Sequence, residues 1–265
     1  MNIAVLGCGN MASAVVLNMH KKFKNLKFFT YTPSFTKAHD LAIATNSKAL
    51  KNLNEFKDID YWILGCKPQQ VKELAKALNG KLKNQKIVSM LAATKIDKLE
   101  LLFDTKDIIR IMPNTPVKLG FGITLFYSNE YISNDFKNTV LEHNQSGSNT
   151  YIMTSENELD QLTVFTGSGP AYVFYLAQTL EKKLLDMGID SKLSRDMINN
   201  LFVGSSELLS SESLDIPRLV DQVTCKGGVT IEAVKVYKDS NLTDITSKAI
   251  DAALKRTDQI IQDLK

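Results

Sequence analysis

The first 153 residues alternate short apolar runs with amphipathic segments. The apolar runs lie at residues 3–6, 26–31, 60–66, 86–91, 107–112, 123–127 and 151–153. Their length and their β-branched residues are typical of strands buried on both faces. Between several of them, apolar residues recur at helical spacing, as from residue 10 to Met19 and over 133–143. This alternation predicts a doubly wound, mostly parallel α/β sheet with helices on both faces.

The pattern changes at Ser155. Ser155 and Glu158 match a capping box that opens a helix, and beyond them we find helical periodicity and no convincing strand. We expect further helices from Pro170 to about 187 and at about 194–210, 216–223, 230–237 and 243–264. The chain is therefore predicted to divide into an α/β domain over residues 1–153 and an all-α domain over residues 154–265.

The last expected helix carries an apolar face. Along it lie Ile245, Ala249, Ala253, Ile260 and Leu264. Part of such a face is usually buried between subunits, so we expect at least a dimer. A helical domain that repeats no nucleotide motif is expected to bind substrate, to dimerise, or both.

Composition and charge exclude several classes of protein. With 44% hydrophobic and 23% charged residues the chain is an ordinary globular protein, and its net charge of +3 with scattered lysines gives no indication of nucleic-acid binding. Cys8, Cys66 and Cys225 are far apart and odd in number, which indicates a reducing compartment. No run reaches transmembrane length, and the first apolar run is too short for a signal peptide. We expect a cytoplasmic protein.

The first strand runs directly into the turn Gly7-Cys8-Gly9-Asn10-Met11-Ala12 and then into a helix. This arrangement binds the pyrophosphate of a dinucleotide. Gly7 makes the turn, Gly9 lets backbone approach the pyrophosphate, and the small Ala12 lets the helix pack on the strand. The N–H groups at the helix N-terminus then face the phosphates. A glycine turn that binds nothing is the alternative, but the strand–turn–helix context favours a dinucleotide.

The second strand ends in Thr30-Tyr31-Thr32-Pro33-Ser34, followed by Lys37. An NAD enzyme places an acidic residue here to bind the ribose 2′-hydroxyl. No acid is present, and hydroxyls beside a cation suit a 2′-phosphate. The sequence therefore favours NADP(H) over NAD(H), although Lys37 as a solvated helix residue is an alternative interpretation.

Two further strand ends are suited to binding a ligand. Lys67 follows the strand at 60–66, and Pro68 stops that strand and opens the next helix. The strand at 86–91 ends in Ala92-Ala93, small residues that leave room for a ring or a ribose. Both lie at the carboxyl ends of parallel strands, where ligands of open α/β sheets bind.

Few other residues offer chemistry. His20, His39 and His143 lie in polar helical stretches away from any motif, so we expect them at the surface, and no spacing of His or Cys supports a metal site. The stretch Thr224-Cys225-Lys226-Gly227-Gly228-Val229-Thr230 places two glycines and a threonine at an expected helix start. From this stretch alone, a loop with a helix N-cap is the favoured interpretation. Backbone N–H groups that hold a small carboxylate, with the Thr230 hydroxyl pointing at it, are the alternative.

Five motifs follow one another along the chain: GCGNMA from Gly7, GCKPQQV from Gly65, RIMPNTP from Arg110, FTGSGPAYVF from Phe165 and DQVTCKGGVTIEAV from Asp221. In this order they resemble pyrroline-5-carboxylate reductase, over residues 3 to about 233. The resemblance implies an N-terminal Rossmann domain and a C-terminal helical domain that builds a homodimer or a larger ring of dimers. It also implies reduction of the cyclic imine 1-pyrroline-5-carboxylate to L-proline with NADPH or NADH. Neither nucleic acid nor membrane is an expected partner.

Matched residue by residue, the resemblance implies two sets of site residues. The cofactor contacts are Leu6, Gly7, Cys8, Gly9, Asn10, Met11, Thr32, Asn52, Gly65, Cys66, Lys67, Pro68, Ala92 and Gln222. The substrate contacts are Glu156, Thr163, Val223, Gly227, Gly228, Val229 and Thr230. Thr230 is the catalytic candidate, because its hydroxyl is expected to hydrogen-bond the ring nitrogen. The protein otherwise supplies positioning, since a protonated imine is already electrophilic.

Departures from the family pattern leave two other functions open. Cys225-Lys226 stands where the family has Ser-Pro, and Thr94 replaces a glycine, changes that affect substrate affinity and range. A dehydrogenase of the β-hydroxyacid type shares the domain plan but needs a catalytic lysine, for which Lys182 or Lys183 is the nearest candidate. A non-catalytic nucleotide-binding regulator is the other alternative, supported only by Lys226.

Overall fold

The structure is a computed structural model that describes residues 1–263, and its contacts divide the chain into two units. The sheet unit holds Met1–Pro170 and the chain from Ala253 onward, and the helical unit holds Ala171–Ala252. The boundary expected after residue 153 stays a prediction. The helix that follows the last strand belongs to the sheet unit by its contacts.

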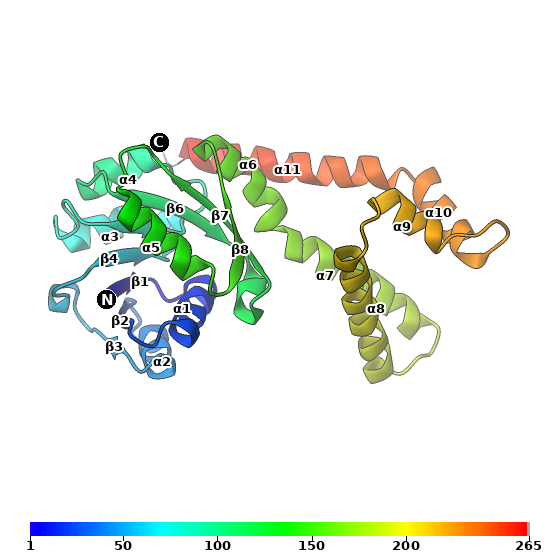
Figure 1. The fold of residues 1–265 in the computed structure, drawn as a ribbon, viewed down its shortest axis with the longest axis horizontal. Helices are drawn as coiled ribbons and strands as arrows, with labels where there is room; N and C mark the ends of the chain where they lie inside the picture. The colour runs from blue at the N-terminus through cyan, green and yellow to red at the C-terminus, as the bar shows by residue number, and fades with distance from the viewer. Residues whose placement is uncertain (264–265) are drawn as a thin grey trace. The chain divides into compact units, whose positions relative to one another are not determined.

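One eight-stranded sheet forms the centre of the sheet unit, with the order β3-β2-β1-β4-β5-β6-β7-β8 (Figure 1). The strands are β1 (Asn2–Leu6), β2 (Lys27–Tyr31), β3 (Lys48–Ala49), β4 (Tyr61–Leu64), β5 (Ile87–Ser89), β6 (Ile108–Pro113), β7 (Gly122–Ser128) and β8 (Ser148–Ile152). Neighbouring strands are parallel except β6 and β7. The order reverses at β1, which has β2 on one side and β4 on the other. The prediction of a doubly wound, mostly parallel sheet is confirmed.

Six helices accompany this sheet. They are α1 (Asn10–Lys22), α2 (Thr36–Ala44), α3 (Val71–Leu78), α4 (Ile96–Phe103), α5 (Asn134–Asn144) and α6 (Glu156–Thr166), with short 3₁₀ helices η1 (Leu53–Glu55), η2 (Pro68–Gln70) and η3 (Thr115–Leu119). Helix α4 and the two-residue edge strand β3 were not among the elements that we expected from the sequence.

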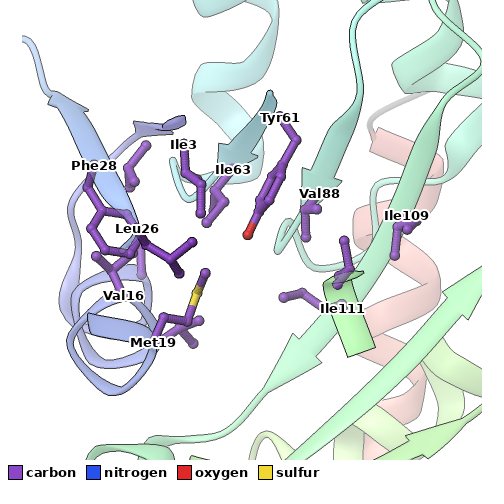
Figure 2. Close-up of a cluster of buried hydrophobic side chains, with 14 of the residues drawn as sticks. Ile3, Val16, Met19, Leu26, Phe28, Tyr61, Ile63, Val88, Ile109 and Ile111 are labelled. Atoms are coloured by element: carbon purple, nitrogen blue, oxygen red, sulfur yellow. The ribbon is translucent and has the colours of Figure 1, made fainter. Parts of the chain in front are cut away.

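The hydrophobic core lies on both faces of the sheet. One cluster joins strand residues such as Ile3 and Ile63 to Val16 and Met19 of α1 and to α5 (Figure 2). On the opposite face, α3 and α4 pack against Leu6 and the other strand side chains that point to that face. Successive side chains of a strand point to opposite faces of the sheet. A parallel strand that is covered on both faces therefore buries all of them, which explains its unbroken apolar run.

Helix α6 packs against β6 and β7 through Leu159, which has no exposed surface. The Ser155 hydroxyl accepts a hydrogen bond from the Glu158 N–H at 3.1 Å, as expected for the helix start. The Glu158 carboxylate accepts from the N–H and the hydroxyl of Thr154, both at 2.7 Å. The buried side chain of Asn114 ties the other end of the helix down, since its amide donates to the carbonyl of Thr166 at 2.9 Å.

The expectation that all three histidines lie at the surface is wrong for His143. Its side chain is buried, and its Nδ1 lies 2.8 Å from the hydroxyl of Tyr61. Tyr61 belongs to β4 and points its ring into the core (Figure 2). Glu142 faces outward on α5, whereas His143 and its neighbour Asn144 continue the buried stripe of Phe136 and Val140. Burial lowers the pKa of His143.

The helical unit contains helices and no strand within the described residues, as predicted. Its elements are α7 (Gly169–Asp186), α8 (Ser191–Ser211), α9 (Ile216–Gln222), α10 (Val229–Asp239) and the first part of α11 (Leu242–Asp263). Asp190 starts α8 three residues earlier than expected, because its carboxylate caps the N–H groups of Lys192 and Leu193. Leu264, the last residue of the expected apolar face, lies outside the described residues. Within residues 1–263, no helix combines the length and apolar content needed to cross a bilayer.

The helical unit buries almost nothing by itself. Helices α7, α9, α10 and α11 contain no buried residue, and α8 buries only Ser194 and Ile198. Large apolar side chains such as Phe174 and Val203 are 65% and 63% exposed. A protein chain rarely leaves so many apolar residues in water, so these helices have the surface of an interface.

Candidate dinucleotide and substrate sites

A pocket of about 380 Å³ lies at the carboxyl ends of β1, β2 and β4. We call it the strand-end pocket; it is lined by Leu6, Gly7, Cys8, Gly9, Tyr31, Thr32, Pro33, Ser34, Lys37, Leu53, Gly65, Cys66, Lys67, Gln70, Glu73, Leu74 and Ala77. This is the point where the strand order reverses, the place where open α/β sheets bind ligands.

Two glycines bring the turns after β1 and β4 into contact. Gly7 has a φ of +97°, and a Cβ on it would lie 2.4 Å from the backbone N of Cys66. A Cβ on Gly65 would lie 2.5 Å from the carbonyl of Gly7 and 2.6 Å from Cβ of Ala12. Side chains at these positions would force β1 and β4 apart, so both glycines are required by packing.

Gly9 has a different role, because a Cβ on it would meet nothing within 4 Å. It is the N-cap of α1 and supplies no side chain to the first turn. The first N–H groups of a helix have no intrahelical acceptor, so this helix end is suited to a phosphate. The space beside Gly9 leaves the backbone open to such a group.

The end of β2 carries hydroxyls and a cation. Thr32 is only 9% exposed, and its hydroxyl is a buried polar atom without a hydrogen-bond partner among the described residues. Exposed Ser34 and Lys37 line the same pocket, and the carboxylate in the lining, that of Glu73, comes from α3. A buried hydroxyl needs a partner, and a ligand in the pocket can supply it.

The two cysteines of the pocket are poor nucleophiles. Burial raises the pKa of the Cys8 thiol to about 12 and that of the Cys66 thiol to about 11. The Cys8 thiol donates weakly to the carbonyl of Tyr31 at 3.9 Å. Both stay protonated at neutral pH and act as small apolar walls. Within residues 1–263, no group of three His, Cys, Asp or Glu side chains could hold a metal ion.

The second candidate site is the loop before α10, in the helical unit. Gly227 has a φ of +78°, and the N–H of Gly228 donates to the carbonyl of Cys225 at 2.9 Å. Gly228 is the N-cap of α10 and supplies no side chain. Thr230 is the second residue of the helix and is exposed. The N-cap of this helix is therefore Gly228 and not Thr230, and the ligand-binding role of the Thr230 hydroxyl stays a prediction.

Comparison with known proteins separates the two halves of the chain. Residues 156–260 match the family model described as pyrroline-5-carboxylate reductase dimerisation. Residues 2–93 match the model described as NADP oxidoreductase coenzyme F420-dependent. The pyrroline-5-carboxylate reductase of Vibrio alginolyticus is 26% identical over 266 residues, which are 97% of each protein. Over nearly its whole length the chain is similar to pyrroline-5-carboxylate reductases.

Solved structures of pyrroline-5-carboxylate reductases share the whole fold. The Streptococcus pyogenes enzyme is 25% identical with a TM-score of 0.86 and covers 97% of this chain and 98% of its own. The Plasmodium falciparum enzyme, solved with NADP bound, is 22% identical with a TM-score of 0.85 and covers 98% and 100%. The expected Rossmann domain followed by a helical dimerisation domain is confirmed.

The strand-end pocket gathers most of the cofactor contacts that the resemblance to pyrroline-5-carboxylate reductase implies. Outside its lining lie Asn10, Met11, Asn52, Pro68 and Ala92. The first four are next in sequence to a lining residue or belong to the glycine turn. Ala92 is exposed and follows β5, which is one strand further along the sheet edge. Gln222 belongs to the helical unit. These roles stay predictions.

Several pocket residues were missed at the sequence level. They are Tyr31, Pro33, Leu53, Gln70, Glu73, Leu74 and Ala77. Leu74 and Ala77 lie on α3, whose position over the pocket follows from the sheet topology and not from a motif.

Two implied substrate contacts already have partners within the sheet unit. Glu156 forms an ion pair with Arg110 at 2.7 Å, and the Thr163 hydroxyl donates to the carbonyl of Leu159 at 2.6 Å. Val223, at the end of α9, is exposed. Of the two lysines considered for a β-hydroxyacid dehydrogenase, Lys182 pairs with Asp186 at 2.7 Å on an exposed helix face, and Lys183 is exposed.

Proposed function

We propose that this chain reduces 1-pyrroline-5-carboxylate to L-proline, the last step of proline biosynthesis, with NADPH preferred over NADH. The observation that carries the proposal is the match of residues 156–260 to the pyrroline-5-carboxylate reductase dimerisation domain. A Rossmann sheet alone serves many dehydrogenases, so the helical half decides between them. The relatives of this name align with nearly the whole chain, which supports the same assignment for both halves.

The strand-end pocket fits a dinucleotide. Gly7 and Gly9 shape a turn at the N-terminus of α1 that receives the pyrophosphate, and Gly65 and Lys67 lie opposite it. The buried hydroxyl of Thr32, with Lys37 nearby in the lining, supports binding of a 2′-phosphate. When bound, the dinucleotide supplies a hydride to the imine carbon.

The substrate carboxylate is proposed to bind at the N-terminus of α10. The N–H of Gly228 is already used by Cys225, so the first N–H groups of α10, at Val229 and Thr230, are the better donors. Lys226 adds a positive charge beside this end of the helix and favours an anion there. The loop holds the substrate chiefly through backbone groups.

Thr230 is proposed to hold the ring nitrogen. Its hydroxyl can accept a hydrogen bond from the protonated imine and, after reduction, exchange a proton with the amine. A protonated imine needs no strong acid to become electrophilic, so orientation by the protein accounts for most of the rate.

We also propose a cytoplasmic homodimer, or a larger ring of dimers, that takes a small-molecule substrate and no nucleic acid. The exposed apolar side chains of the helical unit and its match to a dimerisation domain support the assembly. Light scattering should give at least twice the mass of one chain. A monomer at working concentrations would contradict the assembly.

The decisive experiment is a spectrophotometric assay with purified protein, 1-pyrroline-5-carboxylate and either NADPH or NADH. We expect oxidation of the cofactor that depends on the imine, with a higher kcat/KM for NADPH. Oxidation of NADPH or NADH with an oxo compound that is reduced to a β-hydroxyacid, and not with the imine, would favour the dehydrogenase alternative. Cofactor binding without turnover of either substrate class would favour a regulator.

A further inference from the structure

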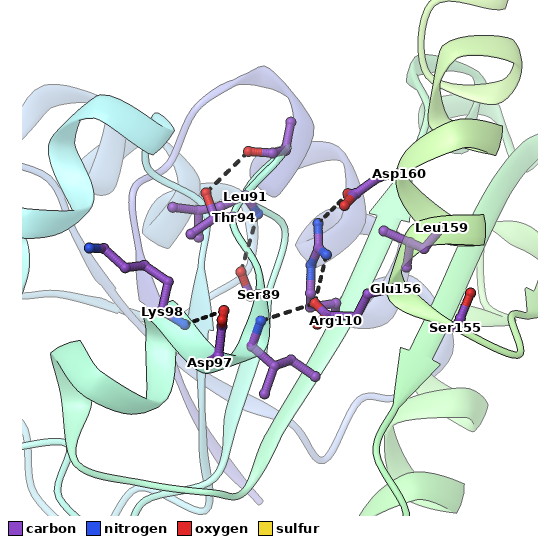
Figure 3. Close-up of polar contacts among 12 residues, drawn as sticks. Ser89, Leu91, Thr94, Asp97, Lys98, Arg110, Ser155, Glu156, Leu159 and Asp160 are labelled. Carbon is purple, nitrogen blue, oxygen red and sulfur yellow. Dashed lines mark hydrogen bonds and ion pairs between the residues drawn. The ribbon is translucent and has the colours of Figure 1, made fainter. Parts of the chain in front are cut away.

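An ion-pair cluster connects three elements of the sheet unit. Arg110, on β6, has a side chain with no exposed surface. Its two terminal nitrogens lie 2.7 Å from Oε1 of Glu156 and 2.7 Å from Oδ1 of Asp160, both on α6 (Figure 3). The guanidinium therefore fixes the first two turns of α6 to the sheet.

The same oxygen of Glu156 has a second partner. Oε1 accepts a hydrogen bond from the backbone N–H of Ile96 at 3.0 Å (Figure 3). Ile96 is the first residue of α4, and its N-cap, Lys95, supplies no side-chain cap. Glu156 thus caps α4 from another helix, and Arg110 holds the carboxylate in the position where it does so.

The segment that enters α4 is a strained turn. Ala93 has a φ of +54°, a left-handed conformation that is unfavourable for a residue with a Cβ. The Thr94 hydroxyl donates to the carbonyl of Ala92 at 3.1 Å, and the N–H of Leu91 donates to the Ser89 hydroxyl at 3.3 Å. Such a conformation persists only where its surroundings hold it. The bond from Ile96 to Glu156 fixes its far end.

This turn lies on the sheet edge that carries the pocket. Ser89 pairs with Leu64 in the register of β4 and β5, and the N–H of Met90 donates to the carbonyl of Leu64. Gly65, the next residue, lines the strand-end pocket. The lining covers the ends of β2, β1 and β4, so the turn after β5 is the next structure along the edge. A dinucleotide with its adenosine ribose at the end of β2 and its pyrophosphate at the turn after β1 would direct its nicotinamide end toward β4 and this turn.

We propose that Arg110 and Glu156 are positioning residues for the nicotinamide end of the cofactor, acting through the turn Ala92–Lys95. This inference rests on the proposed use of a dinucleotide. The resemblance implies that Glu156 is a substrate ligand. In this proposal it is instead a cap that holds the turn in its left-handed form. Arg110 acts one step further away, by orienting Glu156.

The test compares two ligands in the full-length protein. NADPH spans the whole edge, whereas 2′,5′-ADP carries only the adenosine end and does not reach the turn. In Glu156→Ala, we expect the affinity for NADPH to fall about tenfold and the affinity for 2′,5′-ADP to stay within about twofold. The kcat for the imine should fall roughly tenfold to a hundredfold, the size of effect that misplacement of a reactant produces.

Three other variants separate positioning from general stability. Glu156→Gln keeps an oxygen acceptor for Ile96 and should recover most of the selective loss. Glu158→Ala removes a carboxylate from the same turn of α6. Among residues 1–263 this carboxylate accepts hydrogen bonds from Thr154, and its loss should leave kcat and both affinities unchanged. Thr94→Val loosens the turn without touching the ion pair, so it serves if Glu156→Ala does not fold. It should also weaken NADPH binding selectively, by at least threefold.

The outcomes are distinct. Equal changes in the affinities for NADPH and 2′,5′-ADP, or no change in either, would overturn the positioning role. If the wild-type protein does not reduce the imine, the proposed function fails, but the comparison of the two ligands still decides the role of Glu156.

Discussion

The two units of this chain place their apolar residues in opposite ways. The sheet unit buries them in clusters on both faces of its sheet. In the helical unit, four of the helices bury nothing, and side chains such as Phe174 and Val203 are mostly exposed. A sheet with helices on both faces completes its own core, whereas long helices satisfy their backbone hydrogen bonds alone and can leave their apolar faces for another chain. The sheet unit therefore completes a hydrophobic core within one chain, whereas the helical unit leaves apolar surface that a second chain can cover.

The ion pairs of the two units provide the largest test of this contrast. Arg110→Met leaves Glu156 and Asp160 without their cation in a buried place and should lower the free energy of unfolding by about 3–5 kcal/mol. Arg195→Met breaks a similar arginine–carboxylate pair in the helical unit, where the arginine is exposed, and should cost less than about 1 kcal/mol. Urea unfolding of both variants measures the difference. Equal losses would show that burial does not separate the two units.

The glycine turn gives a second comparison, within the sheet unit. Gly7→Ala places a Cβ 2.4 Å from the backbone of Cys66 at a φ of +97° and should destabilise the protein by about 2–3 kcal/mol. Gly9→Ala meets nothing within 4 Å and should leave stability nearly unchanged while it weakens NADPH binding. Thermal unfolding and calorimetric titration of both variants check this. Loss of stability in Gly9→Ala would contradict the division of roles.

The third test separates cofactor binding from substrate handling. Thr230→Ala, in the helical unit, should lower kcat about tenfold to a hundredfold, because it removes a hydrogen bond that strengthens in the transition state. Its NADPH affinity should stay at the wild-type value, and Thr230→Ser should keep much of the activity. Thr32→Val, in the sheet unit, should instead weaken NADPH binding with little effect on kcat at saturation. Steady-state kinetics with both variants decide it, and a Thr230→Ala enzyme with normal kcat would remove Thr230 from the mechanism.

The smallest expected effect is a pH dependence confined to the sheet unit, since the three histidines all precede residue 144. Burial lowers the pKa of His143 below its ordinary value of 6.5, so the unfolded chain binds a proton more readily than the folded one. Stability should therefore decrease as the pH falls through about 6.5. His143→Leu should flatten this decrease in thermal unfolding between about pH 7 and 5. If the slope is unchanged in His143→Leu, the pH dependence comes from other groups. The control is His39→Leu, which replaces an exposed histidine.

The sequence by itself determined the strands other than β3, and the turn between β1 and α1. Apolar runs indicate burial on both faces directly, and Gly7 indicates a turn with a positive φ and a close backbone approach that only glycine fits. It also determined the change to helices after Ser155. The loop at residues 224–230 could be found as a helix start with an N-cap. The structure assigns the cap to Gly228, because helix ends depend on local backbone geometry that composition does not record.

What only the tertiary structure decided are the contacts between residues far apart in the chain. His143 lies among polar residues in sequence, but its side chain hydrogen-bonds Tyr61 of β4, 82 residues away along the chain. Arg110 and Glu156 are 46 residues apart, and neither signals the other in the sequence. The hydrophobic pattern fixes which face of an element is buried, but not which element it meets. The packing of the whole sheet decides which elements meet. It places Glu156 where its carboxylate pairs with Arg110 and accepts a hydrogen bond from the N–H of Ile96.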